Sequence, residues 1–164
     1  MQSPEIFPSY DDEASLQLDA AGNLRHLLTL KGLDKQILAE LLDEAQAFVS
    51  APGSPTKRSD SLSGRTVANL FFEPSTRTRA SFDLAGKRLG ADVLNLDVNT
   101  SSRKKGESIL DTIYTLQAMH VDVMVVRDAS AGVPAYITQH VDDHLSILNA
   151  GESDVSHPTQ GLLD

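Results

Sequence analysis

The sequence predicts an α/β fold in which a parallel sheet of about four strands carries helices on both faces, preceded by an N-terminal helix. Beyond residue 64, short apolar runs alternate with stretches of helical periodicity. Continuous apolar runs of this kind are typical of parallel strands that are buried on both faces. The length of 164 residues, with 40% hydrophobic residues, is enough for one domain with its own core.

The N-terminal third predicts an extension, a helix and a loop. Residues 1–23 are polar and acidic and lack a sustained period, so they predict a mobile extension, and the domain itself is expected to span residues 24–164. Residues 34–49 have apolar side chains at helical spacing, with Asp34 as the expected N-cap. Residues 50–64 are rich in Ser, Pro and Gly and predict a loop.

The rest of the chain predicts the sheet and its helices. Strands are expected at residues 66–72, 92–96, 121–126 and 145–148, and helices at 75–89, 107–119 and 133–140. In parallel sheets of this type, ligands bind outside the carboxyl ends of the strands. The residues that follow each strand are therefore the first candidates for a site.

Composition and charge argue against several function classes. The net charge of −9 disfavours nonspecific nucleic-acid binding. No apolar run approaches the roughly 20 residues of a membrane span, and the acidic N-terminus does not resemble a signal peptide, so a cytoplasmic protein without membrane contact is expected. The chain has no cysteine and its 5 histidines are scattered, so no metal site is expected. Dinucleotide and P-loop fingerprints are missing, which disfavours dinucleotide and nucleoside triphosphate binding.

The most informative segment is the run from Phe71 to Arg79, FFEPSTRTR. It joins an expected strand to an expected helix, so that backbone N–H groups and the positive end of a helix dipole face whatever lies in front. Hydroxyl and arginine side chains add donors, which suits an oxyanion such as phosphate. The alternative is an ordinary N-cap at Ser75 with solvated arginines. Arg77 and Arg79 oppose the dipole unless an anion is nearby, which favours binding.

The positive charges of this acidic chain are concentrated near that segment. Half of its 14 Lys and Arg residues are Arg77, Arg79, Lys87, Arg88, Arg103, Lys104 and Lys105. Polar groups also follow the other expected strands, at residues 99–106, Arg127 and residues 157–160. All of these segments are expected at one edge of the sheet, because the strands are parallel. Each has a plain alternative: a solvated loop for the lysines, an ion pair with Asp128 for Arg127, and a turn residue for His157.

Residues 72–79, Phe-Glu-Pro-Ser-Thr-Arg-Thr-Arg, resemble the carbamoyl-phosphate signature of the aspartate and ornithine carbamoyltransferases. Residues 99–101 with 105–108, and residues 149–151 with 157–160, resemble the aspartate branch of that family. The resemblance implies a transferase that moves the carbamoyl group from carbamoyl phosphate to the amine of L-aspartate. The products would be N-carbamoyl-L-aspartate and phosphate, in de novo pyrimidine biosynthesis. The resemblance also implies that the reaction uses no cofactor and no metal.

Carried over by position, the resemblance assigns roles to individual residues. The phosphate would be held at the helix start by Ser75, Thr76, Arg77 and Thr78. Ser101 and Lys105 would reach the same phosphate from a neighbouring subunit of a homotrimer. The carbamoyl carbonyl oxygen would receive hydrogen bonds from three catalytic residues, Thr78, Arg127 and His157. Gln160 would hold the carbamoyl nitrogen. Donors at the carbonyl oxygen suit the chemistry, because negative charge develops there during attack.

The family's aspartate-binding residues lie in a second domain, which the resemblance places beyond Asp164. The chain is therefore expected to be the carbamoyl-phosphate half of the enzyme, inactive alone, with regulatory or dihydroorotase-like chains as optional companions. Two alternatives stay open: an ornithine carbamoyltransferase fragment, which residues 71–74 and 105–107 argue against, and a noncatalytic anion-binding or assembly module. Asp128 departs from the histidine often seen in the family, and its carboxylate is expected to compete for the Arg127 guanidinium.

Overall fold

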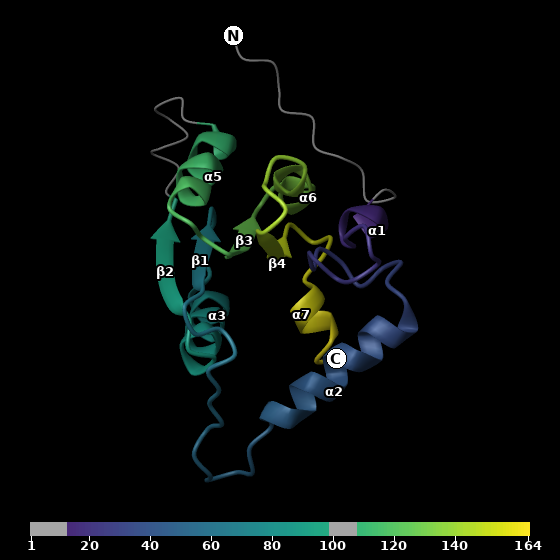
Figure 1. Cartoon of the computed structure of the whole chain (residues 1–164), viewed down its shortest axis with the longest axis vertical. Coiled ribbons are helices and arrows are strands. Elements are labelled where there is room, and N and C mark those ends of the chain that lie inside the picture. The colour runs from purple at the N-terminus through teal and green to yellow at the C-terminus, as the bar shows by residue number, and fades with distance from the viewer. Residues whose placement is uncertain (1–12, 99–107) are drawn as a thin grey trace.

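The structure, a computed structural model, describes residues 13–98 and 108–164. Its sheet consists of β1 (Thr66–Phe71), β2 (Asp92–Asp97), β3 (Val123–Asp128) and β4 (Ser146–Glu152). The helices of the described residues are α1 (Glu13–Leu16), α2 (Lys35–Phe48), α3 (Thr76–Arg88), α5 (Ile109–Ala118), α6 (Val133–Thr138) and α7 (Pro158–Gly161). The predicted α/β fold with a parallel sheet of four strands is confirmed (Figure 1).

The strands are ordered β2–β1–β3–β4, and every neighbouring pair is parallel. The chain therefore moves from β1 outward to β2, crosses back past β1 to β3, and continues to β4. α3 links β1 to β2, and its Phe82 packs on the sheet face formed by Val67 and Phe71. α5 and α6 cover the opposite face, where Ile113 and Ile137 join the larger core cluster.

This reversal of direction creates a topological switch point at the carboxyl ends of β1 and β3. The segment after β1 leads to one face of the sheet, and the segment after β3 leads to the other. Phe71 lies opposite Arg127 in the register, and the Phe72 N–H donates to the Arg127 carbonyl at 2.9 Å. Ligands of open α/β sheets bind at such points. The fold therefore agrees with the expectation that polar side chains gather at the carboxyl edge of the sheet. We call this edge the rim, and its centre lies between β1 and β3.

Residues 13–23 differ from the predicted mobile extension. The segment contains α1 and an antiparallel bridge between Leu18 and Leu24. Gln17 is fully buried, and its Oε1 accepts hydrogen bonds from the N–H groups of Leu28 at 2.7 Å and Thr29 at 3.0 Å. A polar side chain that satisfies buried backbone groups in this way can enter a core, which composition alone does not reveal. Residues 1–12 lie outside the described residues.

Each strand differs from its predicted range by one to four residues at one or both ends, and the start of β3 and the end of β4 show why. β3 begins at Val123 instead of residue 121, and the preceding Asp122 accepts the Thr66 N–H at 2.8 Å. β4 continues to Glu152, although its second half contains the polar residues Asn149 and Glu152. Asn149 and Glu152 are fully buried, and Asn149 Nδ2 donates to Glu152 Oε1 at 2.7 Å. Polar strand residues that pair with one another do not stand out in an apolar pattern.

α2 has the predicted cap and periodicity but no buried residue. Figure 1 shows it set apart from the sheet, on the side of α3 and α7. Leu42, Phe48 and Val49 keep 48%, 42% and 58% of their surface exposed.

In the described part of the chain, no helix is both long and apolar enough to cross a membrane.

Candidate functional site

The first turn of α3 contains the residues that the sequence predicts to bind an anion. Ser75 is the N-cap, and Thr76, Arg77 and Thr78 begin the helix. The Ser75 side chain makes no capping hydrogen bond, and no acidic residue lies in the turn. Thr76 and Arg77 are exposed, whereas Ser75 and Thr78 are half-buried. The positive end of the helix dipole is therefore flanked, within the turn itself, by neutral and cationic side chains.

Three other helices of the described structure close their N-termini with acidic groups. Asp34 caps α2, and Ser108 with Asp111 forms a capping box on α5. At α6, the buried Glu152 accepts the Gly132 N–H at 2.7 Å. Such contacts satisfy the first N–H groups and oppose the dipole. α3 lacks them, so its first turn is better suited to an external anion.

Arg127 reaches the switch point from the end of β3. Its Nε lies 2.7 Å from Glu73 Oε1, and its Nη1 donates to the Ala150 carbonyl at 2.9 Å. The carboxylate that pairs with Arg127 is thus Glu73, whereas the sequence suggested Asp128. Asp128 is buried, and its Oδ1 accepts the Ser130 N–H at 2.8 Å. The guanidinium is therefore held at the rim by Glu73, in the segment that follows β1, and by the Ala150 carbonyl of β4.

Gly151 leaves room for both Arg127 and His157. Its φ is +116°, and a Cβ added there would collide with Arg127 Nη1 and lie 3.3 Å from His157 Cδ2. Burial lowers the pKa of His157, and the charge of Arg127 lowers it further. The imidazole is therefore neutral at pH 7 and carries one N–H donor. Thr159 Oγ1 lies 3.3 Å from Nδ1 of His157. When the Thr159 hydroxyl donates to Nδ1, the single ring proton of the neutral imidazole is on Nε2.

A pocket of about 640 Å³ joins α3 to the segment around α7. It is lined by four of the predicted site residues, Arg77, Thr78, His157 and Gln160. Phe82 and Leu163 add apolar surface to its wall. Gln160 is exposed, and its Nε2 lies 3.4 Å from Asp164 Oδ1 as a donor. The fold therefore brings together two motifs that are far apart in the sequence.

Ser101 and Lys105, which complete the predicted set, lie outside the described residues. Among residues 13–98 and 108–164, no group of three or more His, Asp or Glu side chains is placed to hold a metal ion.

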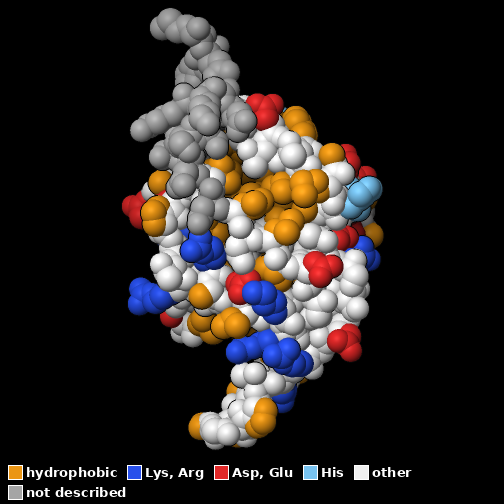
Figure 2. Space-filling view, turned by 90° about the vertical axis from the view of Figure 1, so that its left-hand side faces the viewer, with side chains coloured by type: hydrophobic (Ala, Val, Ile, Leu, Met, Phe, Trp, Pro, Cys, Tyr) orange, Lys and Arg blue, Asp and Glu red, His pale blue; other side chains and the backbone are white. Residues whose placement is uncertain are grey.

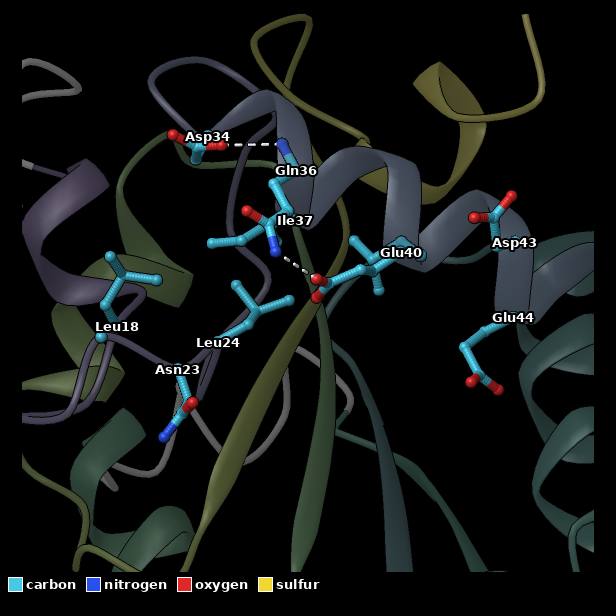
Figure 3. Close-up of a pocket in the computed structure, with 11 residues that line it drawn as sticks. Leu18, Asn23, Leu24, Asp34, Gln36, Ile37, Glu40, Asp43 and Glu44 are labelled. Carbon is cyan, nitrogen blue, oxygen red and sulfur yellow. Dashed lines mark hydrogen bonds between the residues drawn. The ribbon is translucent and has the colours of Figure 1, made fainter.

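A larger hollow of about 960 Å³ lies between α2 and the turn at residues 18–24 (Figure 3). Its charged lining residues are Asp34, Glu40, Asp43 and Glu44, and among the described residues neither Lys nor Arg lines it. Figure 3 also shows the hydrogen bond from Gln36 Nε2 to Glu40 Oε1, at 2.9 Å. Since carboxylates repel an anion, the smaller pocket beside α3 is the better candidate site.

Sequence reasoning gave no role to two residues that shape this site, Glu73 and Gly151. Both stand inside the quoted motifs, so the signal was present. Their contacts with Arg127 depend on β1 and β4 both lying beside β3. Spacing along the chain does not give that strand order.

Comparison with known proteins agrees with this geometry. Residues 25–164 match the carbamoyl-phosphate-binding domain of the aspartate/ornithine carbamoyltransferases. The catalytic subunit of aspartate transcarbamoylase from M. jannaschii is 36% identical, with a TM-score of 0.72, over 86% of this chain and 45% of that chain. Aspartate transcarbamoylase from Trypanosoma cruzi in complex with carbamoyl phosphate is 34% identical, with a TM-score of 0.74, over 92% of this chain and 44% of that chain.

The same Trypanosoma cruzi enzyme in complex with aspartate and phosphate is 34% identical, with a TM-score of 0.74, over 92% of this chain and 46% of that chain. The chain thus spans less than half the length of each of these solved relatives. The family match covers nearly all of the described residues and includes the α3 turn, the end of β3 and the segment around α7. This chain therefore belongs to the aspartate/ornithine carbamoyltransferase family, whose carbamoyl-phosphate-binding domain it contains.

Proposed function

We propose that this domain binds carbamoyl phosphate in the pocket beside α3 and presents it for carbamoyl transfer to the amine of L-aspartate, a cytoplasmic step of pyrimidine biosynthesis. The observation that carries the proposal is the convergence of the uncapped α3 turn, Arg77 and His157 on one pocket, with Arg127 beside His157. The relatives solved with carbamoyl phosphate and with aspartate and phosphate support this choice of ligands.

In this proposal the phosphoryl group lies against the first turn of α3. Backbone N–H groups at residues 75–78 donate to its oxygens, as at other helix N-termini that bind phosphate. The Ser75 and Thr76 hydroxyls and the Arg77 guanidinium add donors, and a guanidinium can contact two phosphate oxygens at once. These groups stabilise the phosphate as it departs with its negative charge.

The carbamoyl carbonyl oxygen faces Thr78, Arg127 and His157. A neutral His157 can donate its N–H to this oxygen, and attack of the aspartate amine increases the negative charge there. Glu73 and the Ala150 carbonyl already hold two nitrogens of Arg127. Arg127 would therefore donate through its remaining nitrogen or release Glu73 when the substrate arrives. Gln160, on the same pocket wall, would hold the carbamoyl nitrogen.

Turnover is expected to need more than this domain. The described residues account for the carbamoyl phosphate end, and positioning the second substrate supplies roughly 7–11 kcal/mol in well-oriented reactions. We therefore expect the 164-residue chain to bind carbamoyl phosphate without forming carbamoyl aspartate at a useful rate. Steady carbamoyl-aspartate production by the purified chain, with no other protein present, would contradict this expectation. Binding without turnover is also what a noncatalytic module would show.

A homotrimer with shared sites is the quaternary arrangement that we propose. The face that carries the edge strand β2 and α5 exposes apolar side chains (Figure 2). Leu94, Leu96 and Met119 line a hollow of about 430 Å³ there, and 59% of the Met119 surface is exposed. An apolar face of this kind supports self-association. Ser101 and Lys105 stand between β2 and α5 in the sequence, and in this proposal they serve the site of a neighbouring subunit.

Arg77→Ala tests the phosphate assignment by isothermal titration calorimetry with carbamoyl phosphate and with inorganic phosphate. Loss of the guanidinium is expected to weaken binding by more than about 1.4 kcal/mol, which is tenfold in affinity. Arg88→Ala is the matched control, because it removes the same charge from the other end of α3. Equal affinities for wild type and Arg77→Ala would refute the assignment.

Mixing two inactive variants tests the shared site, in an enzyme that also carries the second domain of the family. Arg77→Ala and Lys105→Ala subunits should regain activity when they exchange, because some sites then have both residues intact. Exchange that is verified by mass but restores no activity would contradict a site shared between subunits.

A further inference from the structure

α3 is held on the sheet by little apolar contact, although it carries the proposed phosphate site. Gly86 is its only buried residue, and 47% of the Leu84 surface is exposed. Phe82 is the α3 side chain that joins the smaller core cluster, and it is only partly buried. Burial of apolar surface does not by itself fix how a helix is rotated or how far it slides along a sheet. Other contacts must set the position of the α3 N-terminus.

A chain of polar side chains crosses from the core to α3. Asn69 in β1 is fully buried, and its Nδ2 donates to Asn95 Oδ1 at 2.8 Å. Asn95, the register partner of Asn69 in β2, donates through Nδ2 to Asp83 Oδ1 at 2.8 Å. Lys87 completes the chain at the surface, with Nζ 2.8 Å from Asp83 Oδ2. We call the three residues Asn69, Asn95 and Asp83 the amide bridge.

A second contact fixes α3 just beside the amide bridge. A Cβ on Gly86 would lie 2.8 Å from Val93 Cγ2, so the helix backbone lies directly on β2 at this point. Gly86 and Asp83 are three residues apart and share one face of the helix. Val93 and Asn95 are two residues apart and share one face of the strand. The contacts Asp83–Asn95 and Gly86–Val93 therefore lie next to one another along α3 and β2. Together they define both the rotation of α3 about its axis and its position along the strand.

The amide bridge also carries a charge that is unfavourable for an anion site. Hydrogen bonds from Lys87 and Asn95 lower the pKa of Asp83, so its carboxylate is ionised at neutral pH. Asp83 lies seven residues after Thr76, which is about 10 Å along the helix. A negative charge on α3 weakens anion binding slightly through its field, so any favourable effect of Asp83 on phosphate must come from its contacts.

We propose that the amide bridge is a positioning device, in which Asn95 and Asp83 hold α3 in the register that places its N-terminal turn at the switch point. The proposal rests on phosphate binding at that turn. Asn69 anchors the bridge in the core, and Asp83 transmits the anchor to the helix. Loss of the bridge lets α3 shift on the sheet, so that its first N–H groups and Arg77 no longer meet the phosphate together.

Calorimetric titration of the full chain with inorganic phosphate tests the bridge. Asp83→Ala is expected to weaken phosphate binding by about threefold or more, although the field effect of removing a carboxylate would strengthen it. Asp83→Asn keeps an oxygen acceptor for Asn95 and is expected to restore affinity to within about twofold of wild type. Lys87→Ala removes only the exposed end of the chain and is expected to change affinity by less than about twofold.

The proposal is overturned if Asp83→Ala binds phosphate as tightly as wild type does, or more tightly. Asn95→Ala, at an exposed position of the edge strand, gives an independent second variant, and unchanged affinity there has the same meaning. Urea unfolding of each variant separates loss of fold from loss of position. Failure of wild type to bind phosphate, or equal binding by Arg77→Ala, would instead refute the proposed function, and the positioning role with it.

Discussion

His26 is expected to make the stability of this domain depend on pH. The residue is 2% exposed, and its Nδ1 accepts the Ile147 N–H of β4 at 3.0 Å. Burial, reinforced by the neighbouring charge of Arg25, lowers the pKa of His26 from 6.5 to about 4. Protonation in the folded state would place a charge in the core and remove the acceptor for Ile147.

The sign of the effect follows from proton linkage. The folded pKa lies below the unfolded pKa, so the unfolded chain takes up the proton first as the pH falls below 6.5. The contribution of His26 is fully present above pH 6.5 and is lost progressively as the pH falls to about 4. A shift of this size corresponds to about 3 kcal/mol over the whole range and about 2 kcal/mol between pH 7 and pH 5.

Urea unfolding of wild type and His26→Asn at pH 7, 6 and 5 measures this contribution. Asparagine keeps an acceptor for the Ile147 N–H but does not titrate. We expect the free energy of unfolding of wild type to fall between pH 7 and pH 5 by about 2 kcal/mol more than that of the variant. His120→Asn is the control, because His120 is exposed and its φ of 60° suits asparagine. Parallel pH profiles for wild type and His26→Asn would refute the reasoning.

Three further substitutions test packing and site geometry. Gly86→Ala gains roughly 1 kcal/mol of helix propensity, but the new Cβ would lie 2.8 Å from Val93 Cγ2. We therefore expect the variant to unfold at a lower urea concentration than wild type, and a higher midpoint would mean that α3 does not lie directly on β2. Asn149→Ala removes the donor to Glu152 and to the Leu28 carbonyl. We expect the free energy of unfolding measured in urea to fall by roughly 1–3 kcal/mol, and an unchanged value would mean that these two hydrogen bonds do not stabilise the fold. Gly151→Ala would displace Arg127 from the rim, so calorimetry should show a larger loss of affinity for carbamoyl phosphate than for phosphate. Equal losses of affinity for the two ligands would argue against contact between Arg127 and the carbamoyl group.

The sequence predicted the sheet and the position of α3 because both depend on local signals. Apolar runs mark strands that are buried on both faces, and the segment before Ser75 ends such a run at the start of a helical period. α2 was predicted equally well at its cap, yet its apolar face is not buried in this structure. Periodicity reports which side chains share a face, but it does not report what covers that face.

The contacts within the site were less predictable, because they depend on which strands are neighbours. An ion pair with Asp128, the next residue in the sequence, was the plain alternative for Arg127, but the guanidinium pairs with Glu73 across the β1–β3 boundary. Gln17 was assigned to a mobile extension, although its carboxamide satisfies two backbone N–H groups in the core. Both contacts join polar groups that are distant in sequence, and hydropathy patterns do not contain this information.

Backbone amide chemical shifts during a titration with carbamoyl phosphate test the central proposal most directly. If the phosphoryl group lies against the α3 N-terminus, the largest saturable shifts should occur at the N–H groups of Thr76, Arg77 and Thr78, and Arg77→Ala should abolish them at the same ligand concentration. The amide chemical shifts of α2, whose residues line the acidic hollow, should remain unchanged. Saturable shifts confined to residues away from α3, or no shifts at all, would contradict the proposal that this turn is the phosphate site.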